Sequence, residues 1–373
     1  MDHSARTFKR FGQVTLLLLL SVAAVSSQKS VSPRRVWSVG PLTKSQPVMG
    51  FAFGPGGATF TGPHVDSQTS SIFAATRSVA FAGDRIVLVS MIGMRRVEVQ
   101  GKQASEEVYQ LLSLDAATGK VEATREIDAF SSVQVFATND AHVIVTGKSL
   151  LRLTPELKDD GSFDYRATGH RFGNVENISP DGTTLGNETS PGFELIDTRT
   201  LKATELTADP SVDTSVSSKG FVTDNVHWTR DYPTDLGFIT YTDAAGEHLL
   251  YHGACGGRPQ FLTDDLVFEP GCESPLIIDT HGNLVRTISV KGSFSYAGVS
   301  QNGQRFALQI ASFSDSGSLK GERFAIYSLD TGQLAAEVKP DELPEGQSWT
   351  AFSPDGSMFA VGSPLKLTLY RLP

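Results

Sequence analysis

The sequence has few of the features that mark helical proteins and proteins that cross membranes. No long stretch carries apolar residues at three- and four-residue spacing, whereas alternation of apolar and polar residues recurs along the chain. The apolar run at residues 14–25 is shorter than the roughly 20 residues that a membrane-spanning helix needs. The pattern therefore predicts an all-β protein with many short strands joined by turns.

The N-terminus has the order of a targeting segment. Arg6, Lys9 and Arg10 precede the apolar run, and small residues follow it, with Val25 and Ser27 placed as in a signal-peptidase site. This order predicts a secretory signal peptide over residues 1–27 and a mature domain over residues 28–373, in a periplasmic or extracellular location. An uncleaved membrane anchor is the alternative.

Removal of residues 1–27 leaves 29 Lys and Arg against 40 Asp and Glu, a net charge of −11. A surface of that charge repels nucleic acids and anionic membranes. The partner we expect is therefore a protein or an extracellular polymer, with no nucleic acid and no membrane span after cleavage. We expect the mature chain to be a monomer.

Cysteine is nearly absent, with only Cys255 and Cys272 in the whole chain. In an oxidising compartment two cysteines at this separation can pair, and closing the loop would stabilise the fold by about 3 kcal/mol. We predict a disulfide between them, with two buried free thiols as the alternative.

Strands that end in a short acidic or glycine-containing turn recur along the chain. Their mean spacing is 43 residues, close to the 40 to 45 residues of a four-stranded propeller blade. The residues just before these turns are Leu114, Leu153, Ile196, His252, Ile278, Leu329 and Leu372. A second element, a turn followed by apolar alternation, precedes several of them, as in "ISPDGTTLG" (178–186) and "FSPDGSMFAVG" (352–362). The repeats predict a β-propeller of about seven four-stranded blades.

Two intervals in this series are irregular. Ile196 and His252 are 56 residues apart, and His252 and Ile278 are only 26 apart. If His252 and Ile278 belong to one blade, the number of blades falls to six. Eight blades is a further alternative.

The last repeat has its inner strands but no outermost strand. The segment 34–42, "RRVWSVGPL", is extended and has no partner of its own. Pairing these two ends would close the ring and remove open sheet edges. We therefore expect the N-terminal strand to complete the C-terminal blade.

At "LSLDAATGKVEATREI", "YSLDTGQLAAEV" and "FSPDGSMFAVGS" the chain resembles the WD40-like and YVTN-type β-propeller repeat proteins that bacteria export. The resemblance extends over most of residues 34–373. It implies a propeller fold, in a group that contains scaffolds, binding modules and a minority of enzymes, so it favours no single activity.

No motif for catalysis, a cofactor or a metal stands out. A Gly-x-Ser-x-Gly elbow is missing, and none of the three tryptophans follows the "LDAATGKV" turn, where the repeats of quinoprotein dehydrogenases carry theirs. His248 and His252 would point to one face of a strand, but about 13 Å apart, too far to share a metal ion. We assign no catalytic, cofactor-binding or metal-binding residues.

Two stretches have the composition of binding loops. The glycine-rich segment 51–64 is expected to form a long loop on one face of the ring, and residues 226–235 have the aromatic and arginine content of an interface. The candidate contact residues are Phe51, Phe53, Phe60, His64, Trp228, Arg230 and Tyr232.

The sequence thus favours a binding or scaffolding module that uses its loops and central channel. A hydrolase or lyase acting on an extracellular polymer is the alternative, and a structural protein of the cell envelope is a third. Histidines and carboxylates converging in the channel would favour the enzyme, whereas an apolar aromatic rim would favour the binding module.

Overall fold

The computed structural model describes most of the chain after residue 31. The described ranges are 32–40, 51–54, 57–60, 76–99, 101–129, 133–164, 175–188, 193–206, 214–224, 237–254, 258–271, 274–313, 319–340, 348–363 and 366–373. Every regular element in these ranges is a β-strand, so none of them contains a helix that could cross a membrane.

Seven antiparallel four-stranded sheets form the blades. Blade 1 contains β4 (Thr76–Ala82), β5 (Arg85–Val99), β6 (Lys102–Asp115) and β7 (Val121–Ala129). Blade 2 contains β8 (Val135–Ala137), β9 (Val143–Val145), β10 (Leu150–Leu153) and β11 (Asp159–Phe163). Blade 3 contains β12 (Val175–Ile178), β13 (Thr184–Glu188), β14 (Phe193–Asp197) and β15 (Ala203–Leu206). Blade 4 contains β16 (Thr214–Val216), β17 (Gly220–Asp224), β18 (Gly237–Asp243) and β19 (Gly246–Ala254).

The remaining blades follow the same order. Blade 5 contains β20 (Gln260–Thr263), β21 (Leu266–Glu269), β22 (Leu276–Asp279) and β23 (Leu284–Thr287). Blade 6 contains β24 (Ser293–Val299), β25 (Arg305–Phe313), β26 (Leu319–Ser328) and β27 (Leu334–Val338). Blade 7 contains β28 (Trp349–Phe352), β29 (Met358–Gly362), β30 (Leu367–Arg371) and β1 (Arg34–Val39). A separate hairpin is formed by β2 (Phe51–Gly54) and β3 (Gly57–Phe60).

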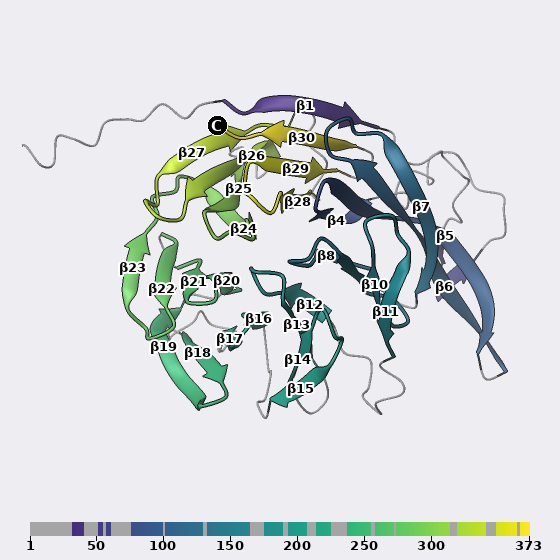
Figure 1. The fold of residues 1–373 in the computed structure, drawn as a ribbon, viewed down its shortest axis with the longest axis horizontal. Coiled ribbons are helices and arrows are strands. Elements are labelled where there is room, and N and C mark those ends of the chain that lie inside the picture. The colour runs from purple at the N-terminus through teal and green to yellow at the C-terminus, as the bar shows by residue number, and fades with distance from the viewer. Residues whose placement is uncertain are drawn as a thin grey trace, which may run out of the picture.

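The blades stand around a common axis, with the first strand of each blade innermost (Figure 1). The ring closes in blade 7, where β1 lies antiparallel to β30, from Arg34 opposite Arg371 to Val39 opposite Leu367. Both the seven-bladed propeller and its closure by the N-terminal strand are therefore confirmed. Counting from the axis outward, the turns between first and second and between third and fourth strands share one face, called here the turn face. The second-to-third connections lie on the opposite face, called the hairpin face.

The core consists of seven apolar clusters, one at each interface between neighbouring blades. Strand alternation explains this arrangement, because successive side chains point to opposite faces of a sheet. In β5, for example, Val87 packs toward blade 2 and Leu88 packs toward blade 7. Each blade therefore buries both of its faces, which accounts for strands that are apolar on both sides.

Short polar motifs build the turns between first and second strands. Ser179 donates a hydrogen bond to Asp181 (2.6 Å) and accepts one from the Thr184 amide (2.9 Å). Ser353 and Asp355 repeat the first of these contacts at 2.6 Å in blade 7. A hydroxyl followed two residues later by Asp or Asn satisfies the turn's backbone groups locally, which is why the "SPDG" pattern marks these turns.

Turns between third and fourth strands dock on the outermost strand of the preceding blade. In blade 1, the Asp115 carboxylate accepts hydrogen bonds from the amide (2.8 Å) and hydroxyl (2.6 Å) of Thr118. The Trp37 indole in β1 donates a hydrogen bond to the Ala116 carbonyl of this turn (2.9 Å). Trp37 therefore joins the closing strand to the first blade as well as to the last.

Blade 4 explains the irregular repeat spacing. His252 lies in the outermost strand, β19, whereas the position equivalent to Ile196 in the third strand is Thr242. With Thr242 in the series, the two intervals become 46 and 36 residues. The sequence-based choice of His252 was wrong because the apolar residues of β19 imitate a third strand.

A bulge in β19 also overturns the expected orientation of its histidines. His248 lies opposite Tyr241 and His252 lies opposite Phe238, with a register shift between Ile239 and Thr240. The extra residue reverses the alternation, so the two imidazoles belong to opposite faces of the sheet.

Candidate functional site

A cavity of about 240 Å³ lies on the axis of the ring. All seven innermost strands contribute to its wall, so its position follows directly from the propeller architecture. Among the described residues, those lining it include no charged side chain and no histidine. Apolar side chains dominate the wall, and the polar groups are neutral amides and hydroxyls.

Several of these neutral groups connect neighbouring blades. The Asn177 amide donates to the Thr214 carbonyl (2.6 Å) and accepts from the Val216 amide (3.1 Å), which joins blade 3 to blade 4. The Thr350 hydroxyl donates to the Ala297 carbonyl, which joins blade 7 to blade 6. These side chains hold the cavity wall together.

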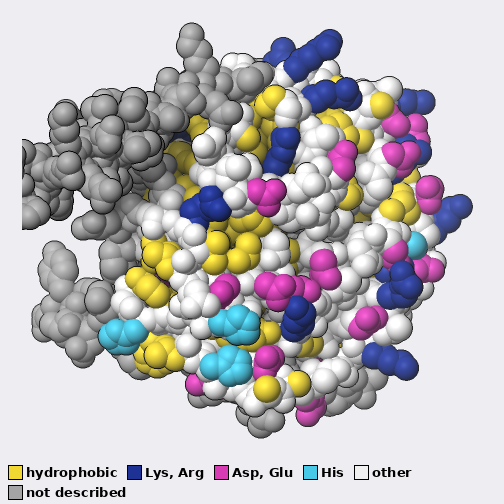
Figure 2. All heavy atoms as spheres, turned by 60° about the vertical axis from the view of Figure 1, so that its left-hand side comes forward, with side chains coloured by type: hydrophobic (Ala, Val, Ile, Leu, Met, Phe, Trp, Pro, Cys, Tyr) yellow, Lys and Arg dark blue, Asp and Glu magenta, His cyan; other side chains and the backbone are white. Residues whose placement is uncertain are grey.

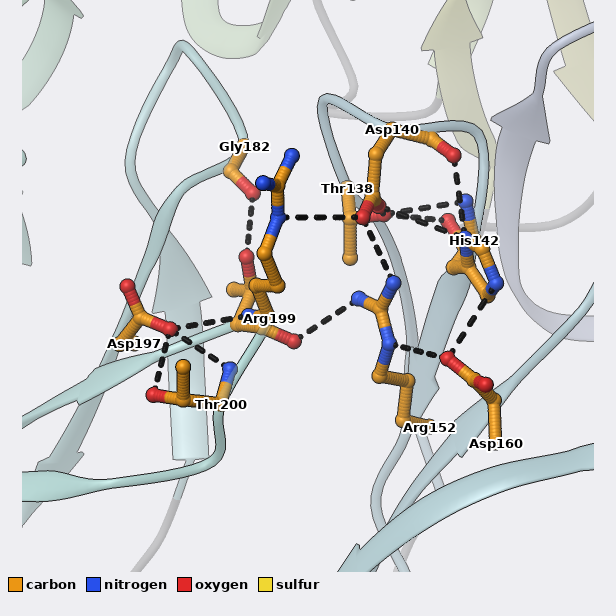
Figure 3. Close-up of polar contacts among 10 residues, drawn as sticks. Thr138, Asp140, His142, Arg152, Asp160, Gly182, Asp197, Arg199 and Thr200 are labelled. Carbon is orange, nitrogen blue, oxygen red and sulfur yellow. Dashed lines mark hydrogen bonds and ion pairs between the residues drawn. The ribbon is translucent and has the colours of Figure 1, made fainter.

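A charged cluster lies at the turn face between blades 2 and 3 (Figure 3). The guanidinium of Arg152, only 4% exposed, binds Asp160 (2.7 Å), Asp140 (2.6 Å) and the Thr198 carbonyl (2.9 Å). His142 lies 3.4 Å from Asp140 and 3.3 Å from Asp160. Residues from four turns and strands thus converge on one buried cation.

The electrostatics of this cluster favour a structural role. Burial alone would raise the pKa of Asp140, but hydrogen bonds from Arg152 and Thr138 outweigh it and lower the pKa to about 2. A carboxylate held that firmly in its charged form is a poor proton acceptor near neutral pH. The cluster therefore connects blade 2 to blade 3 rather than supplying a general base.

A groove between blades 4 and 5 holds further titratable groups. Its lining contains Lys219, Tyr241, Asp243, His248, Leu249, Asp265, Thr280 and His281. On this side of the ring, histidines and acidic side chains gather in one area (Figure 2). Lys219 pairs with Asp265 at 2.8 Å, and His248 lies 3.8 Å from Asp243. Within the described ranges, no three His, Cys, Asp or Glu side chains are close enough to share a metal ion.

Glu269 is a buried carboxyl group at the hairpin-face end of β21. Its side chain is 1% exposed, and its only hydrogen bond among the described residues comes from the Gly271 amide (3.3 Å). Burial raises the pKa of Glu269 to about 7, and the nearby carboxylate of Asp224 adds to the shift. Glu269 does not line the axial cavity, so its proton affects stability rather than the cavity's chemistry.

We expect Glu269→Gln to remove a pH dependence of folding. The native carboxyl keeps a proton that the unfolded chain releases between about pH 4.5 and 7, so wild-type stability falls as the pH rises through that window. The loss is on the order of 3 kcal/mol for a shift of this size. Denaturant unfolding at pH 5 and pH 8 measures the free energy of unfolding of both proteins. Relative to the wild type, the variant should be more stable at pH 8 than at pH 5, and an equal difference at both pH values would contradict this assignment.

The predicted site residues fall mainly outside the described ranges. Phe51, Phe53 and Phe60 lie in the β2–β3 hairpin, with Phe51 opposite Phe60, so a strand pair replaces part of the expected loop. The others, His64, Trp228, Arg230, Tyr232, Cys255 and Cys272, lie outside them, as does the predicted signal peptide. Sequence reasoning missed Arg152 and Glu269, and nothing in their local pattern distinguishes them from ordinary strand residues.

The chain was compared with solved structures, family models and curated proteins. The C-terminal WD40 domain of Sif2, a solved crystal structure, is 11% identical, covers 81% of this chain and 97% of its own, and gives a TM-score of 0.44. No family model and no curated protein matches the sequence. The fold assignment therefore rests on the strand order of the seven sheets.

Proposed function

We propose that this chain is an exported propeller that binds a partner protein as a scaffolding or recognition module. The observation that supports it best is the neutral wall of the axial cavity, where a propeller hydrolase or lyase would need converging histidines and carboxylates. The charged groups around Arg152 are taken up by two ion pairs within blade 2 and by one hydrogen bond to the Thr198 carbonyl of blade 3. The net charge of −9 favours a partner with a basic surface, since complementary charge accelerates encounter.

The hairpin face is the docking surface in this proposal. Strands β5 and β6 continue past their neighbours: β4 ends opposite Ser90 and β7 ends opposite Glu107, while the hairpin runs on to Val99 opposite Lys102. Figure 1 shows this hairpin reaching out from the ring. Among the described strands, none pairs with either edge of this extension, which would allow another chain to add a strand there.

A large apolar side chain lies on the same face. Phe313, at the end of β25, is 53% exposed, and β25 and β26 form the connection of blade 6 on the hairpin face. An exposed aromatic ring beside extended hairpins has the composition of a protein contact.

The test is cross-linking of the exported chain in its host, followed by affinity capture and mass spectrometry, with two matched variants. Phe313→Ser removes an exposed apolar side chain from the hairpin face, and Leu249→Ser removes one that is 58% exposed in β19 at the rim of blade 4. We expect one stoichiometric protein with the wild type and with Leu249→Ser, reduced at least several-fold with Phe313→Ser. Equal capture by the two variants, both folded by circular dichroism, would contradict docking on this face.

A further inference from the structure

One side chain reaches across the axial cavity at the turn face. Gln301 comes from the turn between β24 and β25 in blade 6, and its amide donates a hydrogen bond to the Ala137 carbonyl of blade 2 (3.3 Å). The same amide nitrogen packs so close to Gly182 of blade 3 that a β-carbon there would lie 2.8 Å from it. Blades 2 and 3 stand across the axis from blade 6, so Gln301 spans the end of the channel.

One side of the cavity wall carries hydrogen-bonding groups that the protein does not use. Gln260 and Tyr296 lie on β20 and β24, the neighbouring innermost strands of blades 5 and 6, and both line the cavity. Neither side chain has a hydrogen-bond partner in the described part of the chain. Burial raises the pKa of Tyr296, so its hydroxyl stays protonated and able to donate.

The other polar side chains of the wall, such as Asn177 and Thr350, already have hydrogen-bond partners within the protein, and the remaining lining side chains are apolar. Val79, Phe136 and Ile178 contribute from blades 1, 2 and 3, on the far side of the axis from Gln260 and Tyr296. With its unused hydrogen-bonding groups on one side and no charged side chain among the described lining residues, the cavity favours a neutral molecule over an ion.

We propose that the axial cavity binds a small neutral molecule with an apolar body of about two fused rings and one hydroxyl group directed at Gln260 and Tyr296. The size follows from comparison: a cavity of about 150 Å³ holds benzene, and this one measures about 240 Å³. The site is separate from the proposed protein docking surface and does not depend on it.

The test uses 2-naphthol and naphthalene, which share the ring body and differ in the hydroxyl. Isothermal titration calorimetry with the wild-type protein should show saturable one-to-one binding of both. Tyr296→Phe removes one hydroxyl without changing the shape of the side chain, and it should weaken 2-naphthol about five- to tenfold while leaving naphthalene unchanged. Tyr327→Phe, a buried tyrosine of the same blade that does not line the cavity, should change neither.

Two results would overturn the proposal. The first is a lack of saturable binding of either compound to the wild-type protein. The second is that Tyr296→Phe changes both affinities equally or changes neither. In that case Tyr296 would not form a hydrogen bond with the ligand's hydroxyl group. Capture experiments with a partner protein leave both readouts untouched, so the two proposals can fail separately.

Discussion

Gly119→Ala is expected to destabilise the ring at its closure by roughly 3 kcal/mol or more, through strain and overpacking together. Gly119 adopts φ +73° in the third-to-fourth turn of blade 1, where an L side chain is unfavourable. A β-carbon there would lie 2.8 Å from Trp37 Cδ2 and 2.9 Å from Val39 Cγ2. Both neighbours belong to β1, so the added methyl group pushes the closing strand away from blade 1.

Gly101→Ala separates the two causes. Gly101 has nearly the same backbone conformation, φ +76°, but a β-carbon there would meet nothing within 4 Å. Only the conformational cost of about 1 kcal/mol remains for that variant. Denaturant unfolding of wild type and both variants measures the difference, and equal losses would mean that the contact with β1 adds nothing to closure.

The closing strand that Gly119 contacts is a part of the fold that the sequence predicted correctly. Apolar and polar residues alternate in both β30 and β1, and this pattern is visible in each segment by itself. The last repeat lacked an outermost strand and residues 34–42 lacked a partner strand, so the need to avoid free sheet edges predicted that the two would pair. Alternation failed in β19, where the bulge between the residues opposite Ile239 and Thr240 breaks the period of two. The period of two therefore predicts which face a side chain points to only where the hydrogen bonds between two strands are regular.

The candidate sites depend on contacts that no local pattern records. Gln301 reaches across the cavity to a carbonyl 164 residues away in the sequence. Glu269 acquires its raised pKa from burial and from Asp224, which lies in the neighbouring blade. Such properties arise when blades pack, so the sequence could indicate the ring and its axis but not which side chains give the cavity its polarity.

Arg152 is the clearest case of a residue whose importance comes from packing, and its replacement should have the largest effect among the charged residues. Arg152→Met keeps much of the apolar stem and removes the guanidinium that binds Asp140 and Asp160. Asp140 and Asp160 are 23% and 44% exposed, so water compensates part of the charge that the variant leaves unpaired. The expected loss of stability is therefore about 2 to 3 kcal/mol, below the range for a fully buried pair. Denaturant unfolding at pH 7 measures it.

Arg199→Met is the matched control. Arg199 also approaches Asp140, at 3.7 Å, but its side chain is 72% exposed, so water replaces the contact and the expected change is under about 1 kcal/mol. Adding Asp140→Asn to Arg152→Met should recover part of the lost stability, because it removes one of the charges left unpaired.

The pH dependence supplies an independent check on the same contacts. The lowered pKa of Asp140 contributes stability that is fully present above about pH 4 and lost as the pH falls through about 2. Without Arg152 that pKa should rise, so the gap in stability between wild type and Arg152→Met should narrow as the pH is lowered from 7 toward 3. A gap that stays constant over this range, or an Arg152→Met variant no less stable than Arg199→Met, would mean that the ion pairs of the buried guanidinium with Asp140 and Asp160 do not stabilise the fold.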